Sequence, residues 1–297
     1  MAKAKELSPE QFRRMQLTEL DILIEFDRVC RKNNIQYVLF GGSLLGAIRH
    51  QGYIPWDDDA DIGMLREDYD CFKKHLDELD PSICFFQDHD TDPEYRWGYG
   101  KLRRTGTKYV RVGQEHLKCR TGIFVDVFPM DDIPKSVLFQ IFQDWHCFCL
   151  RKILWSIVAK ANTKGFWKLW FTVLSKIPVA IPFKGFEKYA RKSRNSSPNR
   201  VRCLAYPATG KLYKKNPLTE RYGMPKEWFT ERFEYLFEGK LFYSSRDYDT
   251  VLKYIYGDYL KLPDAKGREQ HAPFSEIEFP EESVEVLDDD YKMCKNR

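Results

Sequence analysis

The chain has 297 residues, of which 43% are hydrophobic, so it is long enough and apolar enough to bury a core in one large domain or two small ones. Its formal net charge of +4 is too small to predict nucleic-acid binding. Its eight cysteines lack the spacing of a zinc site, and we expect them to be reduced thiols in a cytoplasmic protein.

Apolar segments set the expected relation to membranes. Residues 1–10 contain no apolar run, and Lys or Arg interrupts every later run before it reaches the length of a membrane span. We therefore expect no secretory signal and no transmembrane helix. The protein should be either soluble or bound to a membrane surface.

The chain begins with the pattern of a long helix. Ser8 can cap its first turn, Pro9 fits the first helical position, and Gln11 can close a capping box. Apolar residues then recur at helical spacing until Asn33. A core strand is expected next, at residues 35–40.

A glycine-rich turn follows this strand. Gly41, Gly42 and Ser43 precede a short helical pattern that ends near Gly52. Free backbone N–H groups at the start of a helix bind phosphate, and glycine lets the phosphate approach closely. The turn therefore predicts a phosphate site.

A row of acids comes directly after this helix, with Asp57, Asp59 and Asp61 at alternate positions. In an extended strand, which we expect from residue 59 to residue 65, alternate side chains share one face. Their repulsion predicts either bound protons or a divalent cation, and hard oxygen ligands suit Mg²⁺ or Mn²⁺. Acids and phosphate site together indicate phosphoryl transfer. The alternative is a loop of surface acids that only keeps the protein soluble.

A helix is expected at 66–79 and a strand at 83–87. Residues 94–111 then mix aromatic and cationic residues and predict strands with a turn at Gly106. Lys101 and Arg103 could neutralise phosphate, or they could be the solvated cations of an edge strand.

An apolar strand is expected at residues 122–131 with one acid, Asp126, inside it. Burying a lone carboxylate costs several kcal/mol unless it is paired or bound to a metal. Asp126 is therefore either a functional carboxylate or a structural one that pairs with an arginine.

The pattern changes between Trp145 and Phe186, where aromatic residues and lysines alternate at helical spacing. Two helices are expected, and Pro178, Pro182 and Gly185 should break the helical series. Residues 151–200 carry many Lys and Arg but only one acid, Glu187. Such helices either pack on the core with their lysines exposed or lie in a membrane interface.

A family resemblance rests on residues 41–61, Gly-Gly-Ser-Leu-Leu-Gly-Ala-Ile-Arg-His-Gln-Gly-Tyr-Ile-Pro-Trp-Asp-Asp-Asp-Ala-Asp. Gly-Gly-Ser, a short helix and Asp-x-Asp form a signature of the nucleotidyltransferase superfamily. The full string resembles the LicD family, which includes bacterial phosphocholine transferases and has the fukutin-related proteins as distant relatives. Lys-Leu-Arg at 101–103, and Gly-Asp-Tyr at 257–259 with a nearby His271, resemble two further LicD blocks.

The resemblance implies an α/β (α+β) fold of nucleotidyltransferase type, with a mixed twisted sheet flanked by helices and a helical insertion. The expected parts are a catalytic core at 1–135, a basic aromatic helical insertion at 136–200, and a C-terminal part at 201–297 that completes the core.

Site residues follow from the same resemblance. Asp59, Asp61 and Asp126 are expected to be catalytic, and Mg²⁺ or Mn²⁺ is expected to be the cofactor. The expected metal ligands are Asp57, Asp59 and Asp61. The residues expected to bind the donor are Gly41, Gly42, Ser43, Arg49, Lys101 and Arg103.

The implied reaction transfers phosphocholine, or a similar phospho-alcohol, from CDP-choline or another CDP-alcohol to a hydroxyl group of a cell-surface glycan. The acceptor would belong to lipopolysaccharide, teichoic acid or capsule, and could be lipid-linked. The alternatives are a nucleotidyltransferase that uses an NTP and releases pyrophosphate, and a non-catalytic scaffold. We expect a cytoplasmic enzyme with a peripheral contact to the inner membrane face and no nucleic-acid partner. Aromatic residues near the cationic block, Tyr95, Trp97, Tyr99 and Tyr109, favour choline in the donor, and the alternative is that they belong to the core.

Overall fold

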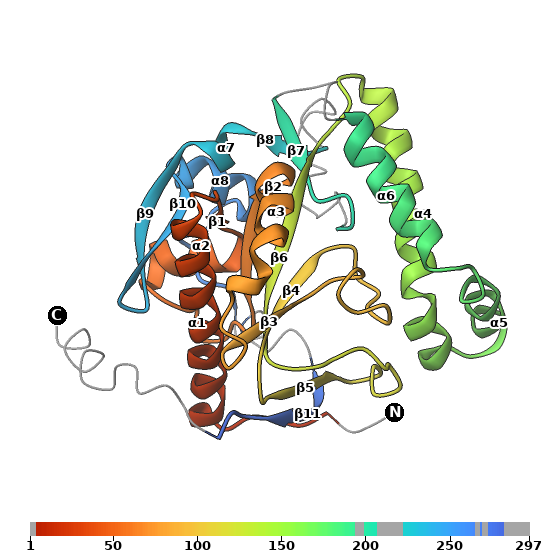
Figure 1. The fold of residues 1–297 in the computed structure, drawn as a ribbon, viewed down its shortest axis with the longest axis horizontal. Helices are drawn as coiled ribbons and strands as arrows, with labels where there is room; N and C mark the ends of the chain where they lie inside the picture. Colours follow the sequence, from red (N-terminus) through yellow and green to blue (C-terminus); the bar gives the residue numbers. More distant parts are fainter. Residues whose placement is uncertain (1–3, 194–198, 207–221, 265–267, 269–272, 282–297) are drawn as a thin grey trace.

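A mixed sheet of seven strands forms the centre of the computed structural model, which describes residues 4–193, 199–206, 222–264, 268 and 273–281 (Figure 1). Its strands are β1 (Val38–Leu39), β2 (Ala60–Leu65), β3 (Cys84–Gln87), β4 (Gly100–Arg104), β6 (Phe124–Asp132), β7 (Arg200–Arg202) and β8 (Met224–Pro225). The order is β1-β2-β6-β4-β3, and β7 joins β6 to β8. Strands β2 and β6 are parallel, and the other neighbours are antiparallel. The predicted α/β fold with a mixed sheet is confirmed.

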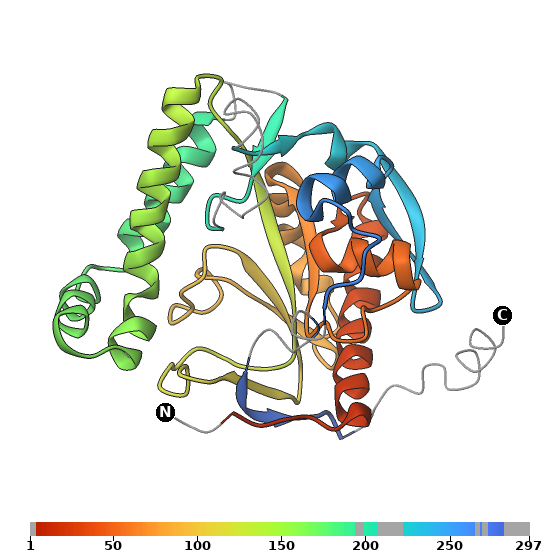
Figure 2. The ribbon, with the colours of Figure 1, turned by 180° about the vertical axis from the view of Figure 1, so that it is seen from behind.

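Helices cover both faces of this sheet (Figures 1 and 2). They are α1 (Pro9–Lys32), α2 (Gly41–His50), α3 (Arg66–Phe72), α7 (Glu227–Thr230) and α8 (Tyr248–Tyr256). Alternation along the strands divides the core, because successive side chains point to opposite faces. Ile62 and Val127 pack with Phe26 of α1 and Phe72 of α3. Phe128 packs in a second cluster with side chains of α2 and α8.

Two small sheets extend the core. Strand β9 (Arg232–Phe237) pairs with β10 (Lys240–Ser245), and β5 (Lys108–Arg111) pairs with β11 (Phe274–Glu278). The strands predicted around Gly106 are present as β4 and β5. They do not pair with each other, because β4 joins the central sheet and β5 binds a strand from the end of the chain.

The predicted element boundaries agree closely at α1 and less well elsewhere. Ser8 and Gln11 form the predicted capping box, with N···O distances of 3.2 and 3.0 Å. Strand β1 is shorter than expected, and β2 begins one residue later than expected, at Ala60. The helix predicted at 66–79 is α3 followed by a 3₁₀ helix.

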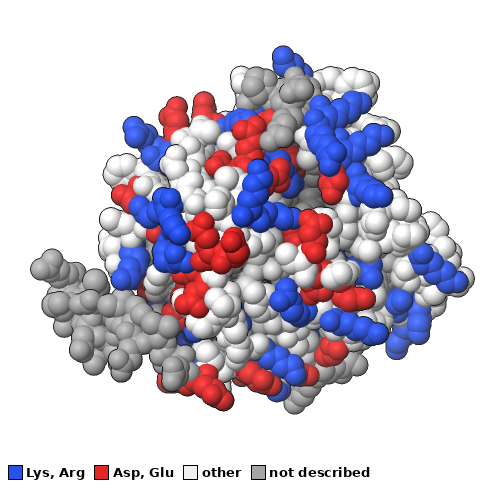
Figure 3. All heavy atoms as spheres, in the orientation of Figure 1, with Lys and Arg blue, Asp and Glu red and all other residues white. Residues whose placement is uncertain are grey.

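Three helices form an arm beside the sheet, drawn in green in Figure 1. Helices α4 (Val137–Asn162) and α6 (Ala180–Ser193) lie side by side, and α5 (Gly165–Leu174) packs on α4. Lys and Arg side chains gather over this arm in Figure 3. Among the described residues, no helix combines the length and the apolar composition needed to cross a membrane.

Pro178 lies in the break between α5 and α6, as predicted, but the prediction that Pro182 and Gly185 would also break the helical series was wrong, because α6 runs through both. Pro182 lies in the first turn of α6, where its missing N–H group costs no helical hydrogen bond. Gly185 allows close packing, since a Cβ atom there would lie 2.7 Å from Cδ1 of Leu150 in α4. The predicted boundaries between the three parts of the chain stay predictions, and His271 lies outside the described residues.

Candidate active site

Three neighbouring strands place charged residues in one row across the sheet. Asp61 of β2 lies opposite Asp126 of β6, and Asp126 lies opposite Lys101 of β4. Residues at the same register position of adjacent strands project from the same face. Asp59, directly before β2, completes a cluster in which carboxylate oxygens of Asp59, Asp61 and Asp126 all lie within 4.8 Å of one another.

Asp57 differs from the prediction that it would share one strand face with Asp59 and Asp61. Because β2 begins at Ala60, Asp57 lies in the preceding loop and is outside the alternation of the strand. It groups instead with Asp58 and Asp59. In the cluster around Asp61, the third carboxylate is that of Asp126 and not that of Asp57.

The N-terminus of α2 faces these acids. A Cβ atom at Gly41 would lie 2.9 Å from Oδ2 of Asp61, and one at Gly42 would overlap the Asp57 carboxylate. Gly41 also has a φ of +55°, which favours glycine. The Ser43 hydroxyl accepts a hydrogen bond of 2.8 Å from the Asp61 N–H group. The predicted phosphate-binding turn and the acid row are therefore in direct contact.

The loop that carries the acids is held from both ends of the chain. The side-chain amide of Gln16 in α1 donates to the carbonyl oxygens of Ile54 and Asp57, each at 3.1 Å. Glu238, in the turn between β9 and β10, accepts a hydrogen bond of 2.9 Å from the Tyr53 N–H group. Glu238 also forms an ion pair with Arg13 of α1.

Burial and mutual repulsion raise the pKa values of the carboxyl groups. Burial, with Asp59 and Asp58 nearby, raises the pKa of Asp57 to about 8. Burial and the charges of Asp126 and Asp58 raise the pKa of Asp59 to about 6, against the opposite effect of Arg111 and Lys101. The pKa of Asp61 is raised well above its usual range, first by burial and then by Asp59, Asp126 and Asp57. Such shifts are typical of functional sites.

The arrangement has the chemistry of a divalent-cation site. Oxygen donors of Asp59, Asp61 and Asp126 converge, and their repulsion needs a positive charge. Carboxylate oxygens are the ligands that Mg²⁺ and Mn²⁺ prefer. The residues present therefore fit the expected cofactor, and its binding stays a prediction.

Lys101 supplies a fixed positive charge beside the cluster. Its ammonium group forms a buried ion pair with Asp126 and lies 3.4 Å from the ring centre of Phe124. Burial lowers the pKa of Lys101 to about 8, although Asp126 opposes this shift. Arg111 of β5 adds a second cation, with its guanidinium 3.9 Å from the Asp59 carboxylate.

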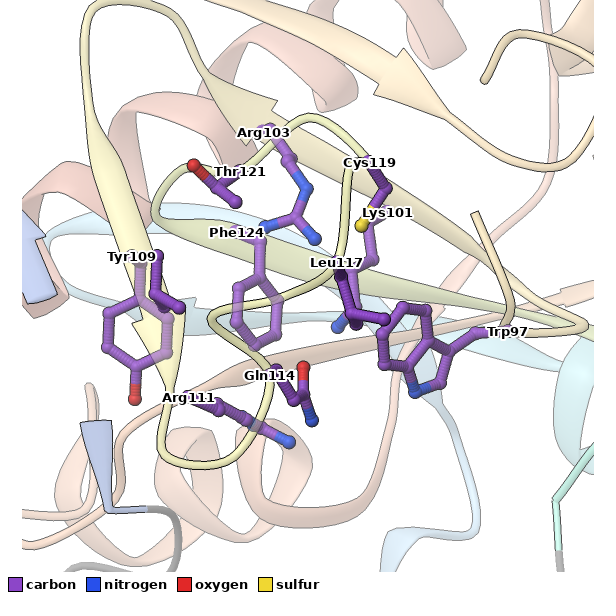
Figure 4. A pocket seen from close by; sticks show the side chains of 11 residues that line it. Trp97, Lys101, Arg103, Tyr109, Arg111, Gln114, Leu117, Cys119, Thr121 and Phe124 are labelled. Carbon is purple, nitrogen blue, oxygen red and sulfur yellow. The ribbon is translucent and has the colours of Figure 1, made fainter. Parts of the chain in front are cut away.

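A pocket opens next to these cations (Figure 4). Lys101, Arg103 and Arg111 contribute positive charge to its lining, and Trp97 and Tyr109 contribute aromatic rings. Arg103 is also committed to the fold, since it donates to the side-chain oxygen of Gln87 and, at 2.8 Å, to the Gly122 carbonyl oxygen.

Arg49 is the predicted site residue that the structure does not bring to the cluster. It lies eight residues along α2 from Gly41, which corresponds to about 12 Å at the helical rise. Its guanidinium donates to the carbonyl oxygen of Tyr259 at 2.8 Å and lies over the Trp56 ring. In this structure Arg49 joins α2 to the segment after α8.

Two charged residues that the sequence did not indicate, Glu19 and Arg111, also lie near the acids. Glu19 of α1 is buried, and its Oε2 atom has no hydrogen-bond partner among the described residues. Its pKa is raised well above the usual range by burial and by the nearby acids, Asp59 first among them. Glu19 could have been noticed because it lies four residues from Met15 and from Leu23, on the apolar face of a helix. No comparable signal separates Arg111 from the other cations of its segment.

These pKa shifts predict an unusual pH dependence for the metal-free protein. We expect its melting temperature in EDTA to rise by a few degrees as the pH falls from about 8.5 to 6.5. Acids whose pKa is raised in the folded state bind protons there that the unfolded chain does not bind, so stability increases as the pH falls through the folded pKa. Asp57, Asp61 and Glu19 act in this direction, whereas the lowered pKa of Lys101 acts against them.

Thermal unfolding with EDTA and with Mg²⁺ across this pH range measures the effect. A bound cation competes with the protons, so the stabilisation by Mg²⁺ should be largest at the alkaline end. If the melting temperature of the metal-free protein fell as the pH was lowered from about 8.5 to 6.5, the result would contradict the assignment of these acids to one buried, mutually repelling group.

Comparison with known proteins gives consistent matches. Residues 34–172 match the family model described as LicD/FKTN/FKRP, nucleotidyltransferase domain. The chain is 28% identical to the lipopolysaccharide cholinephosphotransferase LicD of Haemophilus influenzae, over 87% of this chain and 95% of that protein. It is 34% identical to an uncharacterized protein of Rickettsia prowazekii, over 41% and 40% of the two chains. A short segment, 11% of this chain and 7% of the relative, is 59% identical to the human ribitol 5-phosphate transferase FKRP.

Proposed function

The chain belongs to the LicD family, and on this basis we propose that it transfers phosphocholine from a CDP-activated donor to a hydroxyl group of a cell-surface glycan, with CMP leaving. The name of the Haemophilus relative gives lipopolysaccharide as its acceptor. We therefore propose lipopolysaccharide as the first acceptor to test, before teichoic acid or capsule.

The observation that supports this proposal most directly is the contact between the N-terminus of α2 and the carboxylates of Asp61 and Asp57. Enzymes commonly bind a diphosphate through backbone N–H groups and a divalent cation. The start of α2 would supply the N–H groups, and the adjacent carboxylates would hold the cation. Asp59, Asp61 and Asp126 would hold Mg²⁺ or Mn²⁺, with Asp57 beside them. When bound, the cation would neutralise charge on the diphosphate and on the departing CMP.

The residues of the chain have separate tasks in this reaction. Gly41 and Gly42 let the donor phosphates approach the backbone N–H groups of α2. Lys101 and Arg111 add positive charge close to the cluster. Asp126 accepts the proton of the acceptor hydroxyl as its oxygen bonds to phosphorus. The bond from phosphorus to the CMP oxygen breaks, and CMP leaves with that electron pair.

The pocket gives partial support to choline as the donor alcohol. Trp97 and Tyr109 line it, and aromatic faces attract quaternary ammonium groups. Tyr109 is itself buried against Phe124 and Phe274, Tyr95 is fully buried, and the partly buried Tyr99 packs against Phe128. Of the four aromatic residues predicted for choline, Trp97 therefore contributes a partly exposed ring to the pocket.

Product analysis tests the proposal. Protein with Mg²⁺ would be incubated with lipopolysaccharide and, in turn, with CDP-choline, CDP-ribitol, CDP-glycerol and CTP. We expect CMP release that needs both CDP-choline and the acceptor. Release of pyrophosphate from CTP would support the NTP-dependent alternative. A faster reaction with CDP-ribitol or CDP-glycerol would mean that the donor alcohol is not choline. No product from any donor would support a non-catalytic scaffold.

A further inference from the structure

The first turns of α4 have a reversed pattern of polarity. Gln140 and Gln143 are buried there, whereas Leu138, Phe142 and Trp145 are exposed. A helix of a soluble domain normally buries its apolar side chains and exposes its glutamines. The sequence of this segment is therefore adapted to an apolar neighbour on its outer side.

The exposed apolar positions continue along one face of α4. Leu138, Ile141, Trp145, Phe148 and Trp155 are all exposed and follow steps of three, four and seven residues, which keep them on one side of the helix. This row is about 26 Å long at the helical rise. The opposite side of α4 already packs on α6, through buried residues such as Leu150 and Leu154.

Helix α5 adds a second apolar surface. Its sequence, Gly-Phe-Trp-Lys-Leu-Trp-Phe-Thr-Val-Leu, is largely apolar, yet none of its residues is buried. Phe166 is 71% exposed, and Trp167, Leu169 and Trp170 are also exposed. Four of the seven tryptophans of the chain are exposed on this arm: Trp145, Trp155, Trp167 and Trp170. Large exposed apolar patches mark interaction surfaces, and tryptophan is enriched where membranes meet water.

The charge of the arm indicates which neighbour it fits. Residues 137–193 contain ten Lys and Arg and two acids, which gives a net charge of +8, twice the +4 of the whole chain. One acid, Asp144, is paired with Arg202, and the other, Glu187, lies 3.6 Å from Arg191. The ammonium group of Lys152 lies 5.1 Å from the ring centre of the exposed Phe148, so a cation lies beside an aromatic ring on α4. Figure 3 shows this concentration of Lys and Arg over the arm.

We infer that the outer face of α4 and α5 docks on the surface of a bilayer that contains anionic lipids. Phe, Trp and Leu side chains enter the boundary between headgroups and acyl chains, and the lysines contact lipid phosphates. The helices lie along the membrane, since no described helix is built to cross it. This docking is independent of the proposed reaction and would bring the chain to lipid-linked acceptors.

Vesicle flotation of the full chain tests the inference. We expect binding at low salt to vesicles of phosphatidylcholine with about 30% phosphatidylglycerol, release at high salt, and little binding to phosphatidylcholine alone. A double variant, Phe166→Ser with Trp167→Ser, should weaken binding by about tenfold or more. A charge variant, Lys164→Glu with Lys168→Glu, should do the same without changing the aromatic residues.

Matched controls lie on β10, away from the arm. Leu241→Ser removes a similarly exposed apolar residue, and Lys240→Glu reverses a similarly exposed cation, so both should bind as the parent does. All of these side chains are exposed, so the variants should melt with the parent.

Two outcomes would overturn the inference. One is a parent protein that stays unbound at low salt. The other is a concentration-dependent dimer in sedimentation that Phe166→Ser abolishes, because the occupant of the face would then be a second copy of the chain.

Discussion

Replacing Asp59 by Asn is expected to slow transfer by about 10³-fold or more while leaving the metal-free protein at least as stable as the parent. The substitution keeps the shape of the side chain and removes one of the charges that repel Asp126 and Asp58. Activity should fall because the cation loses a ligand at the step where charge develops on CMP. Mg²⁺ should raise the melting temperature of the parent and have little effect on the variant.

Asp90→Asn is a suitable control, because Asp90 lies in another acidic group, is largely exposed and pairs with Lys73. It should keep parental activity and the parental response to Mg²⁺. If Asp59 were instead a structural carboxylate, removing its charge would cost about 1–3 kcal/mol of stability, and activity would fall only as far as folding does. A variant that melts lower yet retains near-parental turnover would place the active site elsewhere.

Replacing Lys101 by Met is expected to destabilise the metal-free protein by about 3–5 kcal/mol and to suppress transfer. Lys101 and Asp126 form a buried ion pair, and removing the cation leaves the carboxylate buried beside Asp61 and Asp59. Because a bound cation supplies the missing positive charge, Mg²⁺ should recover part of the lost stability but not the positioning of Asp126. Chemical unfolding with and without Mg²⁺, together with the CMP assay, measures both effects.

A double-mutant cycle separates this charge effect from lost packing. Lys101→Met combined with Asp126→Asn removes both charges, so the double variant should be more stable than Lys101→Met alone. If the double variant were less stable than either single variant, with losses that simply add, Lys101 would act through packing against Phe124 and not through Asp126.

The sequence predicted which residues of the candidate site lie together where those residues are close in the chain. Gly41, Gly42 and the acid row lie within one short stretch, and the structure places α2 and β2 together as expected. The sequence could not predict that β2 pairs with β6, or the register that places Asp61 opposite Asp126, because strand register depends on long-range contacts. For the same reason, the alternate spacing predicts a shared face for Asp57, Asp59 and Asp61, and only the burial of a lone acid and the family resemblance indicate Asp126.

Long-range packing also explains why the sequence did not indicate Glu19 and Arg111. Neither belongs to a motif, and each reaches the acids only because of tertiary packing, Glu19 from α1 and Arg111 from a strand paired with β11. The reversed pattern of α4 has a related cause. Its apolar positions have a clear helical period, but the period does not reveal which face the rest of the protein covers.

Residues outside the family match support the loop before β2. The family match covers residues 34–172, yet Gln16 holds the carbonyl groups of Ile54 and Asp57 from before this range, and Glu238 holds Tyr53 from after it. Arg13 and Glu238 also form an ion pair, so the segments that support the loop from before and after the matched range contact each other. The matched stretch carries the candidate catalytic carboxylates but lacks some of the residues that hold their loop in place. We therefore expect that residues 34–172, expressed alone or transferred to another protein, would not keep the geometry of the acid row.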